Sequence, residues 1–175
     1  MSDSAFRGRE SELAQWLTGL IEADVQPAPG VTITGLRGMA LNTAPGQYWV
    51  ISSDAPIARE LQSGVSPAAG TATPLSHGYV RLAVCGSGWC DLLSKGISVD
   101  LHPDVLRLGD FVQTGLHHIE LLLQRTGENR VELYVPRSFA VSIWEWLTDA
   151  ALPLGYDLRQ EEARRLVDPP MRKRE

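Results

Sequence analysis

The stretch that most constrains the fold runs from Arg130 to Gly155 and reads RVELYVPRSFAVSIWEWLTDAALPLG. Its first residues alternate polar and apolar side chains, which is the period of a strand buried on one face. Pro136 has no N–H to donate and should end that strand. Ser138 is placed to cap the helix that follows, and Gly155 is placed to end it. The residues of this strand expected to be buried are Val131, Leu133 and Val135, and they alternate with Arg130, Glu132 and Tyr134.

The predicted helix is apolar around most of its circumference. At ~100° per residue it has one apolar side for the core and a second apolar arc beside it, wider than a single packing contact requires. A helix of this kind is covered on two sides, by its own chain or by another subunit. In a chain of 175 residues we expect a partner subunit to supply the second cover. The core side comprises Phe139, Ile143, Trp146, Leu147 and Ala150, and the second side comprises Ala140, Val141, Trp144 and Ala151.

The remaining pattern predicts the α+β class, a mostly antiparallel sheet with helices packed on one face, as in ferredoxin-like units. We expect a single domain over 1–155, with an N-terminal part (9–62), a loop (63–76) and a C-terminal part (77–155). The N-terminal part should hold a helix at 9–24, a bent strand or hairpin at 31–43, a strand at 47–53 and a helix at 56–61. The C-terminal part should hold strands at 77–86, 111–116 and 117–125, a short helix within 86–96 and a structured loop at 97–110.

Composition and charge narrow the classes of function. Hydrophobic residues make up 43% of the chain and charged residues 21%, as in an ordinary soluble protein. No apolar run approaches the ~18–20 residues of a membrane span, and the N-terminus lacks a signal pattern, so we expect a cytoplasmic protein with reduced thiols and no membrane contact. Residues 164–175 carry a net charge of +3, which leaves −8 on the rest and argues against nucleic acid as a ligand. The tail at 156–175 is predicted to be flexible, as a solvated end or as an arm that docks on an acidic surface.

The sequence has few candidates for chemistry. In CGSGWC, Cys85 and Cys90 do not have the spacing of a redox or zinc motif. We interpret this stretch as a strand-to-helix turn capped by Ser87, with an anion on the helix N-terminus as the weaker alternative.

The four histidines also provide no candidate site. His117 and His118 are expected on one strand with their side chains on opposite faces, and His77 and His102 in turns. No phosphate loop, dinucleotide fingerprint or nucleophile elbow is present in the sequence. We therefore expect no catalytic residue, cofactor site or metal site on this chain.

The five tryptophans divide into two groups. Trp16, Trp89 and Trp146 fall at positions expected to be core. Trp49 and Trp144 are the two predicted to face a partner.

Four parts of the C-terminal half together match a known family. They are YVRLAVCGSGWCDLLSKGISVDLHP at 79–103, Gly109 with Gln113 and Thr114, the HIELLLQR strand, and YVPRSFAVSIWEWLTDAA at 134–151. In these parts the chain resembles the gamma subunit of heterotetrameric sarcosine oxidase. Within them, Asp100 to Pro103 and Pro136 to Ser138 match the family's Asp-Leu-His-Pro and Pro-Arg-Ser. Ser87 departs from the pattern, since the family often has proline there. The resemblance covers roughly residues 75–155.

The resemblance implies an accessory role in a larger enzyme. The gamma subunit is similar to part of the folate-binding aminomethyltransferase fold of the glycine cleavage T-protein. In such complexes the alpha and beta subunits carry FAD, FMN and NAD, and the delta subunit carries zinc. The assembly oxidises an N-methyl amino acid through flavin to oxygen and releases its one-carbon unit as formaldehyde or methylene-tetrahydrofolate. N-methylglutamate or dimethylglycine in place of sarcosine, or another electron acceptor, would fit equally well.

On this interpretation, the chain packs on the alpha, beta and delta-type subunits through the 138–152 helix. The candidate interface residues are Arg137, Val141, Trp144 and Trp49. Two alternatives remain open: Arg137 caps local carbonyls, and Trp144 lies inside the chain. The alternatives are a stand-alone folate-binding or one-carbon-transfer protein and a small scaffold protein of an unrelated pathway.

Overall fold

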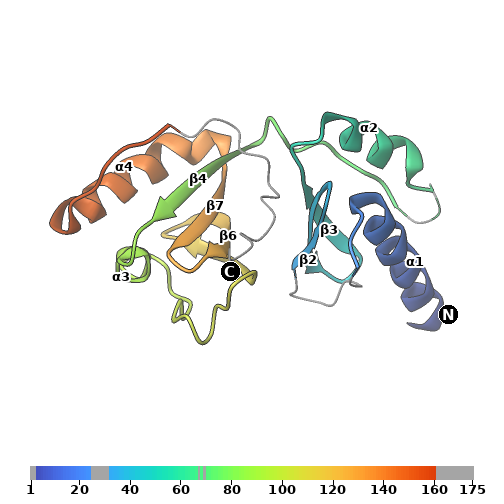
Figure 1. Ribbon diagram of the computed structural model, residues 1–175, viewed down its shortest axis with the longest axis horizontal. Coiled ribbons are helices and arrows are strands. Elements are labelled where there is room, and N and C mark those ends of the chain that lie inside the picture. The colour runs from blue at the N-terminus through green and yellow to red at the C-terminus, as the bar shows by residue number, and fades with distance from the viewer. Residues whose placement is uncertain (1–2, 25–31, 67, 69, 161–175) are drawn as a thin grey trace, which may run out of the picture. The chain divides into compact units, whose positions relative to one another are not determined.

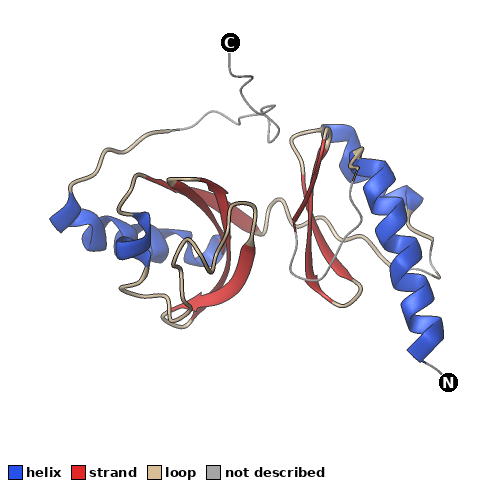
Figure 2. Ribbon diagram, turned by 60° about the horizontal axis from the view of Figure 1, so that its bottom comes forward, coloured by secondary structure: helices blue, strands red, loops and turns tan. Residues whose placement is uncertain are grey.

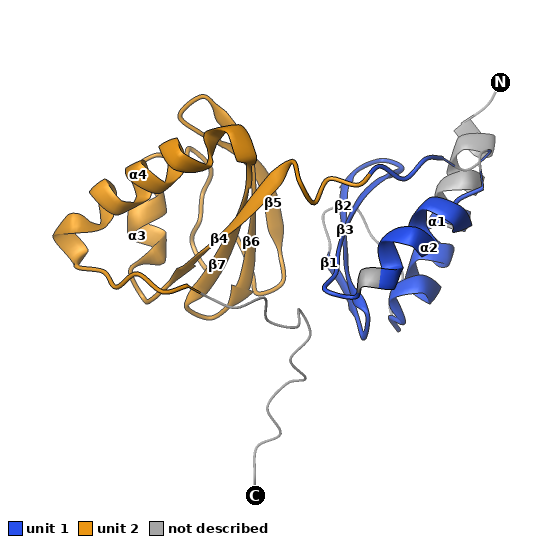
Figure 3. Ribbon diagram, turned by 90° about the horizontal axis from the view of Figure 1, so that it is seen from above, with its two compact units in different colours: residues 1–73, 161–175 blue, residues 74–160 orange. Residues whose placement is uncertain are grey.

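The computed structural model describes residues 3–24, 32–66, 68 and 70–160, with the backbone alone for 3–11 and 55. The described residues form two compact units that divide between Thr73 and Pro74 (Figure 3). The division falls within the loop predicted at 63–76, and each unit has its own sheet. Whether the two units act as the single domain expected over 1–155 stays a prediction, and most of the predicted tail lies outside the described residues.

Unit 1 is a three-stranded antiparallel sheet with two helices on one face (Figures 1 and 2). The strand order is β1-β2-β3, so the pattern at 31–43 is a hairpin. A small core of Ile21, Ile33, Ala40 and Ile57 joins the helices to the sheet. The elements are α1 (Asp3–Ile21), β1 (Thr32–Gly35), β2 (Gly38–Ala44), β3 (Gln47–Ile51) and α2 (Ala55–Gly64).

The β1–β2 turn connects the sheet of unit 1 to both of its helices. Gly35 lies so close to the end of α1 that a Cβ at this position would overlap the carbonyl oxygen of Ile21. Arg37, in the turn itself, forms a bidentate pair with Glu60 of α2 at 2.7 and 2.8 Å and donates from Nε to Asp54 Oδ2 at 2.8 Å. One side chain therefore links the hairpin to Glu60 within α2 and to Asp54, the residue just before it.

Unit 2 is a four-stranded antiparallel sheet with the order β4-β7-β6-β5. Two tight hairpins join β5 to β6 and β6 to β7, and helices α3 and α4 cover one face of the sheet (Figure 1). The α+β class with helices on one face of antiparallel sheets is confirmed. The elements are β4 (Tyr79–Cys85), α3 (Trp89–Leu93), β5 (Phe111–Leu116), β6 (Ile119–Gly127), β7 (Arg130–Pro136), a 3₁₀ turn η1 (Arg137–Phe139), α4 (Ala140–Ala151) and a 3₁₀ turn η2 (Leu152–Leu154).

The core of unit 2 lies between the sheet and the two helices. Its members alternate along the strands and recur every three or four residues along α4, as the sequence pattern predicts. The buried residues of this core are Trp89, Leu92, Leu93, Ile97, Leu101, Leu106, Leu116, Leu121, Leu123, Val131, Leu133, Val135, Ile143, Leu147 and Ala151.

The prediction that β7 is buried on one face is wrong in one respect. Val131, Leu133 and Val135 face the helices as expected, but Glu132 and Tyr134 on the opposite face are buried too. Both polar side chains have hydrogen-bonding partners on neighbouring strands, which compensates for their removal from water. The alternation therefore identified the strand correctly, while the partners of its polar residues were not visible in the sequence.

The start of α4 also differs from the prediction. The chain first makes the 3₁₀ turn η1 after Pro136, so Ser138 lies in that turn and Phe139 occupies the N-cap position without a side-chain cap. Phe139 is 46% exposed rather than core, and Ala151, assigned to the second side, is buried. Because α4 begins only at Ala140, Phe139 does not take the core position that a helix starting earlier would give it. Ile143 and Leu147 are buried as predicted.

His117 and His118 form the two-residue turn between β5 and β6, not part of a strand. Leu116 pairs with Ile119 across the turn, and His117 has a φ of 53°, in the left-handed region. The His117 ring meets the edge of the Trp146 ring on α4, with centroids 5.8 Å apart. The pairing register places the turn here because it keeps Leu116, Leu121 and Leu123 on the helix-covered face.

Arg125 of β6 fastens the loop at 97–110 to the sheet. Its buried guanidinium donates to the carbonyl oxygens of Pro103, Leu106 and Glu128 at 2.9 to 3.3 Å. It also lies 5.7 Å from the centre of the Trp89 ring, a cation–π distance. The Asp-Leu-His-Pro segment is thus held by an arginine that sequence analysis did not identify.

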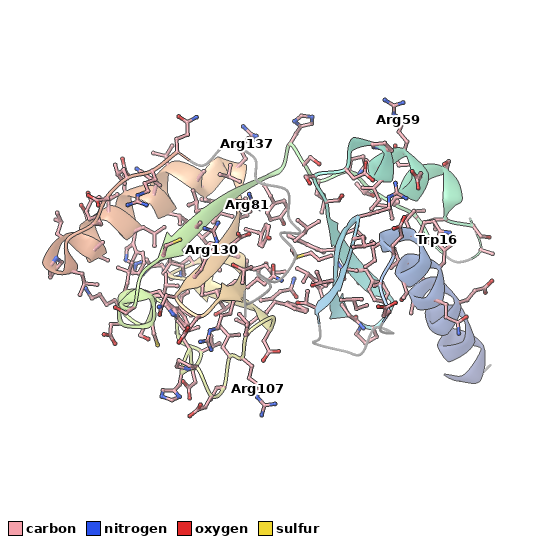
Figure 4. All side chains as sticks on the ribbon, in the orientation of Figure 1. Trp16, Arg59, Arg81, Arg107, Arg130 and Arg137 are labelled. Carbon is pink, nitrogen blue, oxygen red and sulfur yellow. The ribbon has the colours of Figure 1, made fainter. Side chains whose placement is uncertain are left out.

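We predict that Arg125→Met lowers the free energy of unfolding by about 2–4 kcal/mol, because three carbonyl oxygens lose their donor. Arg107 is an exposed arginine of the same loop and points away from the fold (Figure 4), so Arg107→Met should change stability by less than about 0.5 kcal/mol. Urea unfolding of the two variants beside the wild type measures both values. Equal effects at the two positions would contradict the role of Arg125.

The Arg37–Glu60 pair predicts a pH dependence. Its hydrogen bonds to Arg37 lower the pKa of Glu60 below its ordinary value of 4.5. The pair therefore contributes stability above that value, and the contribution is lost as the pH falls through the lower pKa of the folded state. We expect the melting temperature of Glu60→Gln to lie below that of the wild type at neutral pH and to converge with it in acid.

Circular dichroism melts between about pH 3 and pH 7 measure this difference. Glu12→Gln, at an exposed position of α1, controls for the loss of one surface carboxylate in unit 1. A gap between Glu60→Gln and the wild type that stays the same at every pH would exclude the ion pair as its source.

Candidate functional site

An exposed apolar stripe runs along the outer side of α4. Ile143, Leu147 and Ala151 point into the core, while Val141 is 69% exposed and Trp144 is 41% exposed. Leu152, which follows the last residue of α4, is 67% exposed and falls on the same side at helical spacing. Of the predicted second side, Val141 and Trp144 are exposed, whereas Ala140 is partly buried and Ala151 is buried. Glu145 and Thr148 fall beside them at helical spacing, so the outer side is apolar only in part.

The C-terminal end of α4 is anchored from α3. Lys95, just after α3, donates from Nζ to the carbonyl oxygen of Ala150 at 2.7 Å, where the helix dipole favours a cation. Pro153 and Gly155 then prevent the α-helix from continuing, and Gly155 has a φ of 69°. The outer stripe is consequently presented on a helix fixed at its end and not on a loose segment.

Arg137 lies in η1, immediately before α4. Its backbone N–H donates to the carbonyl oxygen of Gly78 at 2.8 Å, and its Nε donates to the carbonyl oxygen of His77 at 2.8 Å. Arg137 therefore binds carbonyls of the segment before β4, distant in sequence, and not the local carbonyls that the sequence left open, while its side chain remains exposed. A role for Arg137 at an interface stays a prediction.

Trp49 occupies a different unit from the other three candidates. It lies on β3, paired with Leu41 of β2, and is partly buried. Arg137, Val141 and Trp144 are brought together on η1 and α4 of unit 2. Of the tryptophans expected in the core, Trp89 is buried, whereas Trp16 and Trp146 are only partly so.

A polar cluster lies on the sheet face of unit 2 opposite the helices, and sequence analysis missed it. Buried Glu132 pairs with Arg81 at 3.5 Å and with Arg130 at 3.1 Å. Tyr134 donates its hydroxyl to Glu132 Oε2 at 3.1 Å, and Gln124 lies 3.4 Å from the same hydroxyl. Figure 4 labels Arg81 of β4 and Arg130 of β7, and Arg137 of η1. The sequence signal was slight: β7 carries Arg130 and Glu132 at alternate positions, and β4 carries the single charged residue Arg81.

The electrostatics of this cluster favour a structural role. Burial raises the pKa of Tyr134 well above its ordinary value, and the Glu132 carboxylate raises it further. Tyr134 therefore remains protonated and keeps donating to Glu132. The Glu132 carboxylate is paired with two arginines and accepts the Tyr134 hydroxyl, so its oxygens are engaged within the sheet.

The other sequence candidates are dispersed. Cys85 is exposed and Cys90 is partly buried, with its thiol 3.6 Å from the carbonyl oxygen of Leu101. The N-cap of the five-residue helix α3 is Gly88, not Ser87, and it makes no side-chain cap bond. His102 lies 3.5 Å from Asp104 in the loop at 97–110. Among the described residues, no three His, Cys, Asp or Glu side chains gather in a way that could hold a metal ion.

None of the helices that the structure describes combines the length and the apolar character needed to cross a membrane.

Comparisons with known proteins agree on one family. The family model for the gamma subunit of sarcosine oxidase matches residues 57–152, from α2 to the first residue of η2. Sarcosine oxidase subunit gamma from Corynebacterium sp. (strain P-1) is 30% identical over 123 residues, which are 69% of this chain and 61% of that protein. The match thus spans about three fifths of the relative's length.

A solved structure shares the fold. A chain of the heterotetrameric sarcosine oxidase from Corynebacterium sp. U-96, in complex with pyrrole 2-carboxylate, superposes with a TM-score of 0.73 at 23% identity. The alignment covers 83% of this chain and 76% of that chain. Because the family match spans more than half of the sequence, the chain belongs to the sarcosine oxidase gamma subunit family.

Proposed function

We propose that this protein is an accessory subunit of a heterotetrameric, flavin-dependent complex of the sarcosine oxidase type, which oxidatively demethylates an N-methyl amino acid. On this proposal, alpha, beta and delta-type subunits hold FAD, FMN, NAD and zinc, and the assembly is cytoplasmic. The gamma chain contributes binding surface rather than reacting groups.

The observation that carries the proposal is the outer side of α4. Val141, Trp144 and Leu152 place apolar surface on a helix whose inner side already packs in a complete core. Exposed apolar residues on one side of a helix are common at interfaces, and tryptophan is a frequent anchor there. The α4 stripe, defined as Val141, Trp144 and Leu152, therefore supports docking on a larger subunit.

Several charged side chains of unit 2 already have partners within the fold, and this supports an accessory role. In unit 2, Glu132 is paired with two arginines, Arg125 holds the loop at 97–110, and Arg137 holds the segment before β4. These groups have structural partners, whereas a catalytic acid or base must be poised for proton exchange with a substrate. The reacting groups of the complex are accordingly assigned to its other chains.

The direct test is affinity capture of the tagged chain from its native cells, with the mass of co-eluting chains and the visible spectrum of the eluate recorded. Larger chains that co-elute with flavin absorbance are the expected result. A colourless chain recovered alone would overturn the proposal, and a thermal shift titration with tetrahydrofolate would then test stand-alone folate binding.

We predict that Trp144→Asp reduces capture of the partner chains at least tenfold, since a buried interface tryptophan commonly contributes about 2–4 kcal/mol. Val141→Asp should act in the same direction. Ser142→Asp adds the same charge at an exposed polar position of the same helix and should leave capture unchanged. Far-UV circular dichroism verifies that each variant is folded.

If Trp144→Asp and Ser142→Asp capture partners equally well, the α4 stripe is not part of the interface. That outcome would leave membership in a complex intact and would move the contact surface elsewhere.

A further inference from the structure

Two carboxylates lie among the apolar side chains on the outer side of α4. At ~100° per residue, Glu145 falls beside Val141 and Leu152 around the helix axis, and Asp149 follows Glu145 one turn later. Both carboxylate residues are exposed. The α4 stripe therefore has one acidic group within it and a second at its margin.

No basic side chain balances these two groups within the part of the chain that the structure describes. α4 itself has no lysine or arginine, and neither Glu145 nor Asp149 forms an ion pair with a described residue. Lys95, near the end of the helix, donates to the carbonyl oxygen of Ala150 instead. Like charges four residues apart repel each other, and a carboxylate in the last turn opposes the helix dipole. Both effects are small while the carboxylates remain in water.

Docking through the α4 stripe changes that balance. A partner that covers Val141, Trp144 and Leu152 also removes water from the surface between them, and Glu145 lies on that surface. Removing water from a carboxylate is costly unless a cation or hydrogen-bond donors replace it. Because no described residue provides a cation to Glu145, the compensating charge has to come from the partner.

We propose that the subunit surface that receives α4 is cationic, with an arginine or lysine side chain opposite Glu145 and Asp149, an inference that rests on the proposed function. The Cβ atoms of residues four apart on a helix are about 5–6 Å from each other, so a single guanidinium group can reach both carboxylates. The occupant of the α4 stripe is thus an apolar surface that bears a positive charge beside its contact with Trp144.

The charged contact and the apolar contact have different tasks at such an interface. The α4 stripe contributes affinity, whereas the ion pair fixes the orientation of the helix and excludes partners with an acidic surface. Removing one member of a buried ion pair leaves the other buried and unpaired, so binding depends on both. Glu145 and Asp149 therefore act in recognition and contribute no stability to unit 2.

The test neutralises the two carboxylates with little change in shape, in the double variant Glu145→Gln with Asp149→Asn. The full-length tagged chain is captured from its native cells, and the recovered partner chains are measured at about 50 mM and about 300 mM salt. We expect the double variant to recover at least tenfold less partner than the wild type, because the cation of the partner is then buried unpaired. Its recovery should also change less with salt than that of the wild type.

Thermal stability separates an effect on binding from an effect on folding. Because neutralisation removes the repulsion within α4 and the carboxylate that opposes its dipole, the isolated double variant should melt at or above the temperature of the wild type. A loss of capture by a chain that is no less stable cannot arise from unfolding. Glu120→Gln with Glu128→Gln removes two exposed carboxylates of unit 2 outside α4, and this matched control should stay within about twofold of the wild type.

The outcomes separate the two proposals. A wild-type chain that captures no partner overturns the proposed function and this inference together. A wild-type chain that captures partners, with equal or greater recovery by the Glu145→Gln, Asp149→Asn variant, overturns the cationic partner surface alone. Equal losses in that variant and in the Glu120→Gln, Glu128→Gln control would assign the effect to the net charge of the chain and would likewise overturn the inference.

Discussion

The packing of α4 against β7 is the interaction on which the C-terminal unit depends. Ile143, Leu147 and Ala151 close the core over Val131 and Leu133, and these residues come from one continuous stretch of chain. Joining a strand to a helix through a short turn costs little loop entropy, so this pair is a natural nucleus for the unit. With the inner side of α4 committed to the core, its outer side is fixed in position and oriented toward solvent.

Buried or partly buried arginines connect segments of the chain that the apolar cores do not join. Arg37 joins the β1–β2 turn to α2, Arg125 holds the loop at 97–110, and Arg81 with Arg130 neutralises Glu132. Removing such a group from water is costly unless hydrogen-bond partners are supplied. The described residues supply them to these guanidinium groups except at Arg125 Nε, which is buried without one. In unit 2 these contacts engage Arg81, Arg125, Arg130 and Glu132.

The proposed contact surface on α4 is held in place by this packing. Because the inner side of the helix is committed to the core, Val141 and Trp144 are exposed at fixed positions. A surface that is already ordered before binding loses less conformational entropy when a partner docks.

The local sequence determined the identity of most elements, the α+β class and the second apolar side of α4, because hydrophobic periodicity depends only on neighbours along the chain. It also carried the family resemblance, through Asp100 to Pro103 and Pro136 to Ser138. The exact start of α4, the turn at His117 and the partners of Glu132 and Arg125 were decided by the tertiary structure. These features depend on strand register and on side chains distant in sequence, such as Arg81 beside Glu132, and a pattern of neighbouring residues contains no information about which distant groups will meet.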